Sequence, residues 1–272
     1  AAEGGLTTTQ MAVFTTAQIA GLTSAQVGAL STTQLRSLSS AQIGALTTIA
    51  EAGLTTAGVA ALGTSQIPGF TTAQIGALTT GQVGALSSAH VGALTITQLG
   101  ALSSSQIGAL ASLSVPGLTT AEIAALKTAQ IVGLTSVQIG ALSIPQLGAL
   151  SSAQIGALTN AALGGLTSSD VASLTSAQII GLTSSQVGAL SLPQLGTLSS
   201  SQMSVLTTSA VTGFTTAEIA ALMTGQILGL TSPQINALTT TQISALSSAQ
   251  VGALTTAALG GLTTIDMSAL ST

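Results

Sequence analysis

One eight-residue pattern runs through almost the whole chain without an insertion or a deletion. From Leu6 to Leu270 every eighth residue is Leu, or Phe at three places, which gives 34 anchors in 272 residues. Counted from its anchor at position 1, the octad reads Leu, Thr/Ser, Thr/Ser, any residue, Gln, Ile/Val/Leu and two small residues, as in residues 22–29. Such a strict period predicts a tandem-repeat architecture, in which one local structure recurs and packs on its neighbours.

Positions 2 and 5 of the octad carry the signals that begin a helix. A Thr or Ser followed three residues later by Gln forms a capping box, and positions 1 and 6 then have the spacing of a hydrophobic staple. Positions 7 and 8 are mostly Gly and Ala, as in Gly28-Ala29, and Gly near a helix end supplies the left-handed conformation that stops the helix. Each octad therefore predicts one short helix of one to two turns.

Two other backbone structures compete with this interpretation. In one continuous helix, a step of eight residues would rotate the anchor by roughly 80° each time, so the anchors would never form a seam. A β-solenoid is the alternative, because Thr and Ile favour strands. The apolar positions 1 and 6 show no alternation of period two, however. We predict an all-α solenoid of short helices that forms a single continuous domain over residues 1–272.

The five prolines fit the octad. Pro145, Pro193 and Pro233 lie at position 4, in the first helical turn, where the missing amide hydrogen costs little. Pro68 and Pro116 lie at position 7, where we expect each to end a helix just after its last aliphatic residue.

Exceptions to the octad recur every six octads, which gives the chain a second, 48-residue period. Acids replace Gln at position 5 in Glu122, Asp170, Glu218 and Asp266; apolar residues recur at position 3 in Ile96, Ile144 and Leu192, and at position 7 in Val132, Ile180 and Leu228; and Glu3 recurs as Glu51. Either six octads make a whole number of superhelical turns, or a six-octad unit was duplicated. We favour the first, because the substitutions stay within one chemical class. One six-sided turn, two triangular turns and three turns of helix pairs all fit this period.

Composition excludes several classes of partner. The chain has 2 Lys+Arg, 6 Asp+Glu and a net charge of −4. Two cations, Arg36 and Lys127, cannot neutralise a phosphate backbone, and no Trp or Tyr is present to stack on bases, so we expect no nucleic-acid partner. The mean hydropathy is +0.72, but Thr, Ser and Gln interrupt every apolar run, so we expect no membrane span. Cys is absent, which excludes disulfides.

The two ends of the sequence are complementary in the octad frame. The last three residues, 270–272, fill the first three positions of an octad, and the first five residues fill the last five positions. This match predicts head-to-tail stacking of copies into an open filament. The alternative is that the sequence is a window from a longer repeat array.

Few residues could carry chemistry. His90 is the single histidine and replaces Gln at position 5, so we interpret it as a structural substitute for Gln. Glu122, Asp170, Glu218 and Asp266 could form a column that binds Ca²⁺, but we interpret each as the acidic partner of its own helix start. We therefore predict no catalytic, cofactor-binding or metal-binding residues, no cofactor and no enzymatic activity.

The repeat unit also carries a resemblance. Runs such as Ala73-Gln74-Ile75-Gly76-Ala77-Leu78-Thr79-Thr80 resemble the octapeptide arrays of large secreted bacterial surface and biofilm-matrix proteins, which are described as adhesin-like. The resemblance covers the whole chain and implies an extracellular structural role. Our main hypothesis is a structural protein that forms an extracellular filament, sheath or matrix fibre. The alternative is a stalk or a Thr/Ser-rich surface that binds a glycan or ice.

Overall fold

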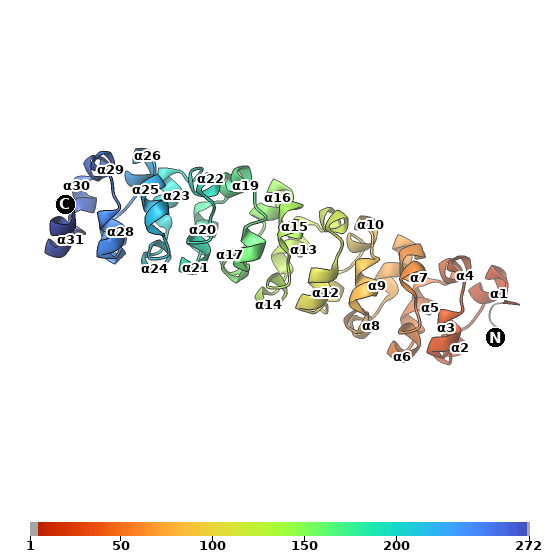
Figure 1. Cartoon of the computed structure of the whole chain (residues 1–272). Coiled ribbons are helices and arrows are strands. Elements are labelled where there is room, and N and C mark those ends of the chain that lie inside the picture. Colours follow the sequence, from red (N-terminus) through yellow and green to blue (C-terminus); the bar gives the residue numbers. More distant parts are fainter. Residues whose placement is uncertain (1–4, 271–272) are drawn as a thin grey trace. The chain divides into compact units, whose positions relative to one another are not determined.

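The computed structural model describes residues 5–270, and over these residues it consists of short helices and connecting segments, without a strand (Figure 1). The helices follow the octads: α2 (Thr16–Ala20) and α5 (Ser40–Ala45) each begin two residues after an anchor. The predicted all-α architecture is confirmed, and the β-solenoid alternative is wrong. None of the helices in residues 5–270 combines the length and apolar character required to cross a bilayer.

Contacts divide the chain into two compact units, unit 1 (Ala1–Leu134) and unit 2 (Thr135–Thr272). Unit 1 contains, besides α2 and α5, α1 (Thr8–Ala12), α3 (Ser24–Gly28), α4 (Thr32–Ser37), α6 (Thr48–Glu51), α7 (Thr56–Ala61), η2 (Thr64–Gly69), α8 (Thr72–Ala77), α9 (Thr80–Gly84), α10 (Ser88–Val91), α11 (Ile96–Leu99), α12 (Ser104–Ala109), η3 (Ser112–Gly117), α13 (Thr120–Ala125) and α14 (Thr128–Ile131). Unit 2 contains α15 (Ser136–Gly140), α16 (Ile144–Gly148), α17 (Ser152–Ala157), α18 (Asn160–Leu163), α19 (Ser168–Ser173), α20 (Ser176–Ile179), α21 (Ser184–Val187), α22 (Leu192–Leu195), α23 (Ser200–Val205), α24 (Thr208–Val211), α25 (Thr216–Ala221), α26 (Thr224–Ile227), α27 (Ser232–Ala237), α28 (Thr240–Ser244), α29 (Ser248–Ala253), α30 (Thr256–Leu259) and α31 (Thr264–Ala269). That both units form one continuous solenoid stays a prediction.

The helix starts are built as the capping box predicts. At α5, Ser39 has extended backbone angles, and its hydroxyl accepts a hydrogen bond from the Gln42 amide at 3.2 Å. Gln42 Oε1 in turn accepts from the Ser39 amide at 2.6 Å. This reciprocal pair satisfies two amides that the first helical turn leaves without intrahelical partners.

The helix ends differ from the prediction. No residue in 5–270 has a positive φ, so the expected left-handed Gly at the helix end is wrong. Instead, the next anchor closes the helix: the Leu46 amide donates to the Ile43 carbonyl at 3.2 Å, and Leu46 then takes an extended conformation. A tight final turn followed by an extended Leu ends the helix and redirects the chain into the next octad without a left-handed residue.

The prolines also differ in part from the prediction. Pro145 and the other two prolines at position 4 lie in the first helical turn, as expected. Pro68 and Pro116 do not end α-helices; they lie inside the 3₁₀-helices η2 and η3. In ordinary octads the amide of position 7 can donate to the carbonyl of position 3, as Gly92 donates to Ser88. Proline cannot make this bond, which favours the tighter 3₁₀ winding.

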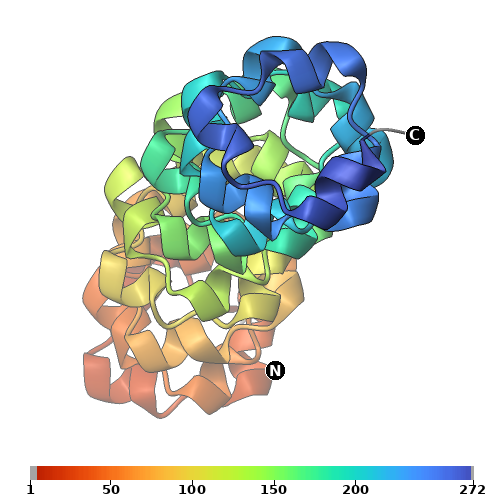
Figure 2. The same cartoon turned by 90° about the vertical axis from the view of Figure 1, so that its left-hand side faces the viewer.

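Three octads make one turn of the solenoid in each unit. Helices pack on the helix three octads further along the chain, so α2 packs on α5 in unit 1 and α28 packs on α31 in unit 2. The capping residues of α2 and α5, Thr15 and Ser39, hold the same octad position in two successive turns. The last helices of unit 2, drawn in blue, lie around a common circuit in Figure 2. The period of six octads is therefore two triangular turns, which confirms that it is a whole number of turns.

The core of each unit consists of the residues at positions 1 and 6. Ile43 and Leu46 are buried, as are their equivalents in the interior turns. The apolar residues that recur every six octads at positions 3 and 7 lie outside this core and are all about half exposed: Ile96, Ile144, Leu192, Val132, Ile180 and Leu228. Their matching exposure shows that octads separated by this period lie in the same environment.

Close contacts between glycines of successive turns give the 48-residue period a physical cause. A side chain on Gly69 would overlap the carbonyl group of Ser40, one turn earlier, and one on Gly44 would lie 2.5 Å from the Gly69 carbonyl oxygen. The same arrangement recurs further along the chain, between Gly140 and Gly165. An octad that ends in Gly-Ala thus faces one that carries Gly at position 8, and along the row of octads that contains Gly44, Gly69, Gly140 and Gly165 these two kinds of octad alternate from turn to turn.

Candidate functional site

The most regular polar structure in the chain is formed by the Gln side chains at position 5. Gln74 is 1% exposed, and its amide has partners on both sides. Its Oε1 accepts from the Thr71 amide at 2.6 Å, and its Nε2 donates to the carbonyl oxygens of Ile43 and Leu46, both at 2.8 Å. One side chain therefore caps its own helix and joins it to the turn before.

This arrangement, which we call the glutamine ladder, recurs through both units. Nε2 donates to the anchor carbonyl 28 residues earlier from Gln34, Gln42, Gln66, Gln74, Gln82, Gln98, Gln106 and Gln130 in unit 1, and from Gln178, Gln186, Gln194, Gln202, Gln226, Gln234, Gln242 and Gln250 in unit 2. Buried carbonyl groups need such donors, because an unpaired one costs about 1–3 kcal/mol.

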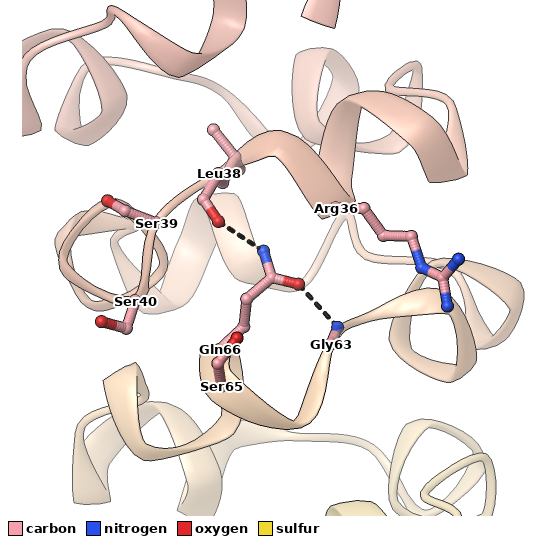
Figure 3. Close-up of a pocket in the computed structure, with 7 residues that line it drawn as sticks. All are labelled: Arg36, Leu38, Ser39, Ser40, Gly63, Ser65 and Gln66. Atoms are coloured by element: carbon pink, nitrogen blue, oxygen red, sulfur yellow. Dashed lines mark hydrogen bonds between the residues drawn. The ribbon is translucent and has the colours of Figure 1, made fainter.

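A hollow of about 350 Å³ lies on the surface where the ladder passes Gly63 (Figure 3). Gly63 stands where most octads carry Thr or Ser, and Gln66 and the hydroxyl groups of Ser40 and Ser65 also line the hollow. Arg36 borders it, with Nε donating to the Ala61 carbonyl at 2.5 Å. A similar hollow, lined by Thr7, Ser31 and Thr33 among others, lies between equivalent octads of the first two turns.

The repeat itself matches a known family. Eight segments of the chain match the family described as the ALTTAQ repeat: residues 4–32, 24–56, 52–80, 80–112, 115–152, 163–200, 211–248 and 219–256. Together they cover more than half of the sequence. The chain belongs to the ALTTAQ repeat family. No curated protein matches the chain. The predicted resemblance to a tandem-repeat array is confirmed at the level of this family, whereas the secreted, adhesin-like setting stays a prediction.

In one ALTTAQ repeat, His90 takes the place of the ladder Gln. Its Nδ1 accepts from the Ser87 amide at 3.3 Å, and its Nε2 lies 2.9 Å from the Leu62 carbonyl oxygen, 28 residues earlier. A neutral ring with its proton on Nε2 fits both contacts. His90 is buried, and it makes the two kinds of contact that Gln makes elsewhere.

The four acidic residues at position 5 are separated along the ALTTAQ repeats. Each accepts hydrogen bonds from the amide and hydroxyl of its own capping Thr, as Glu122 does from Thr119 at 2.7 and 2.9 Å. The same kind of contact at Thr263, mainly from its hydroxyl, lowers the pKa of Asp266. Successive acids are six octads apart in the sequence, and within residues 5–270 no three His, Cys, Asp or Glu side chains gather as a possible metal site.

Replacing Glu122 with Gln should stabilise unit 1 by about 1–2 kcal/mol. Glu122 is buried and accepts at the capping box, but an ionised carboxylate cannot donate to the turn before. Glutamine would keep the acceptor and add the donor that Gln130 uses toward Leu99 and Leu102. Thermal unfolding followed by circular dichroism measures the gain, and a melting temperature at or below that of the unsubstituted chain would contradict it.

Proposed function

We propose that the chain is a structural protein of an extracellular filament, sheath or matrix fibre, in which solenoid turns stack within one copy and from one copy to the next. Its partner in this role is a second copy of itself, and the role requires no catalysis or cofactor. The tandem repeats of the family support a structural role. The extracellular setting rests on the resemblance to arrays of secreted surface proteins.

One observation carries the proposal: every turn has two different and complementary faces. One face donates through Gln Nε2, and the other accepts through backbone carbonyl groups, as the hydrogen bonds from Gln74 to the carbonyl oxygens of Ile43 and Leu46 show. Two such faces join head to tail, and a head-to-tail interface between copies produces an open filament.

The outermost described turns present these faces to solvent. Gln10 and Gln18 are exposed and bond only to their own capping residues, Thr7 and Thr15. At the other end, Leu259 and Met267 occupy position 6 but are 42% and 57% exposed, whereas interior residues such as Ile43 are fully buried. The sequence match between the two ends rests mainly on residues 1–4 and 271–272, which lie outside the described residues, and stays a prediction.

Sedimentation velocity and electron microscopy test the proposed stacking. The purified chain should form fibres whose mass increases with concentration, and the double substitution Leu259→Lys and Met267→Lys should disperse them, because charges at position 6 would be buried in the joint. Ile265→Lys is the matched control: Ile265 lies on the same helix, α31, but at position 4, which faces outward and is 68% exposed. Monodisperse single copies of the unsubstituted chain at high concentration would refute stacking.

A binding surface or stalk is the second candidate, and the ordered hydroxyl groups favour it. Thr95 and Thr97 are 3.0 Å apart through their hydroxyl oxygens, as are Ser103 and Ser105. Ser, Thr and Arg36 also line the surface hollows. This candidate predicts glycan retention on an array or thermal hysteresis in ice, and it would replace the first if the dispersed chain showed either property.

A further inference from the structure

Glu51 is an ionisable residue at a position that belongs to the apolar core in the other octads. It lies at position 6 of its octad, where other octads carry Ile, Val, Leu or Met, and it is 1% exposed. Neither carboxyl oxygen has a hydrogen-bond partner. Its sequence equivalent six octads earlier, Glu3, lies outside the described residues. An unpaired carboxylate in such a site is strongly disfavoured, so the side chain is accommodated best in its neutral form.

The helix that carries Glu51 lacks the glutamine link that joins other helices to the turn before. α6 has four residues, and Ala50 occupies position 5, where the ladder Gln would join the helix to the turn before. Ala50 has no side-chain donor, so this helix has no amide link of the kind that Gln74 supplies to α8. The position of α6 therefore depends on packing. In that packing, Gly53, just after α6, lies against the backbone of Ser24 in α3.

Among the described residues, no charged side chain lies on a helix that packs most closely against the helix of Glu51. The helices packed most closely against α6 are α3 and α8, and neither carries an ionisable side chain. The other ionisable side chains among the described residues of unit 1 are Arg36, His90, Glu122 and Lys127, and all lie on other elements or at their caps. Burial raises the pKa of the Glu51 carboxyl from 4.5 to about 7.

We propose that Glu51 makes α6 a proton-controlled latch: the helix stays seated in the stack while Glu51 is protonated and is released when Glu51 ionises. Because the pKa of the folded state lies above that of the unfolded chain, the full stability is present below about pH 4.5. Stability is then lost as the pH rises through about 7. This direction is opposite to that of a salt-bridged carboxylate, which is stabilising at neutral pH.

Hydrogen exchange measured by mass spectrometry on the whole chain tests the latch. Amide protection factors of α6, corrected for the intrinsic pH dependence of exchange, should fall about 10- to 100-fold between pH 5.5 and pH 8.5, as expected from the raised pKa of Glu51. The matched internal control is α11, which occupies the equivalent place two turns further on, also has four residues and carries both Gln98 and Leu99. Its protection should not change over this range.

Two variants make the proposal falsifiable. Glu51→Ile restores the usual core residue and Glu51→Gln removes the titration at similar size, so α6 should keep constant protection from pH 5.5 to pH 8.5 in both. The proposal is wrong if α6 of the unsubstituted chain shows the same protection at both values, or if Glu51→Ile shows the same loss, since another group would then cause it. Carbon-13 NMR of the Glu51 carboxyl should report a midpoint near the pH at which protection falls.

Discussion

Replacing Gly165 with Ala is expected to lower the free energy of unfolding of unit 2 by about 3–5 kcal/mol. Gly165 lies where the turn of α18 meets the turn of α15, and a side chain there would overlap the carbonyl group of Ser136. Both partners are backbone, so no side chain can rotate to make room. The two turns must separate, which disturbs the buried side chains that they carry, among them Leu163 and Ile139. Urea unfolding followed at 222 nm measures the loss.

Gly148→Ala is the matched control for this substitution. Gly148 lies in α16 of the same unit, and a side chain there would meet no atom within 4 Å. Alanine favours helix over glycine, so the control should leave stability unchanged or raise it by up to about 1 kcal/mol. If both variants unfolded at the same urea concentration, the close approach of the turns would not limit the packing, and our account of the 48-residue period would be wrong.

The sequence predicted the local structure of each octad because the signals lie within eight residues. The hydroxyl of Ser39 and the amide of Gln42 form the capping box that their spacing predicts, and Ile43 and Leu46 form the core. The prediction for the helix ends was wrong because Gly at a helix end can serve two structural purposes. Gly can adopt a left-handed backbone, but here it lets two backbones approach, as Gly69 and Ser40 do.

The number of octads per turn could not be derived from the sequence, because it depends on contacts between residues that lie three or more octads apart. The repeat contained a signal for those contacts: Gln and Glu serve equally well in a capping box, yet Gln strongly predominates at position 5. The preference for Gln reflects its Nε2 group, which Glu lacks and which donates to a carbonyl group of the earlier turn. In the sequence Glu51 pairs with Glu3 in the 48-residue period, and its place at position 6 of the octad indicates a buried carboxyl.

Replacing Gln74 with Leu is expected to cost about 3 kcal/mol. The substitution removes the acceptor for the Thr71 amide and the donor for the carbonyl groups of Ile43 and Leu46, and all three groups lie in or beside the buried interface between turns. Gln74→Glu tests the link between turns alone, because it keeps the acceptor for the cap but removes the donor and turns a carboxylate oxygen toward the two carbonyl groups; about 2 kcal/mol is expected. Urea unfolding and hydrogen exchange in α8 measure both losses.

Gln18→Leu is a control in the same local sequence, because Thr-Thr-Ala-Gln-Ile occurs at 15–19 and again at 71–75. In the dispersed single chain the Gln18 side chain is exposed and bonds only within its own capping box, so its replacement should cost about 1 kcal/mol or less when unfolding is measured at a concentration that keeps copies apart. The difference between the two positions measures what the link between turns adds to the cap. Equal losses at Gln18 and Gln74 would show that the octad needs Gln only to begin its helix, and the ladder would then contribute nothing to holding the turns together.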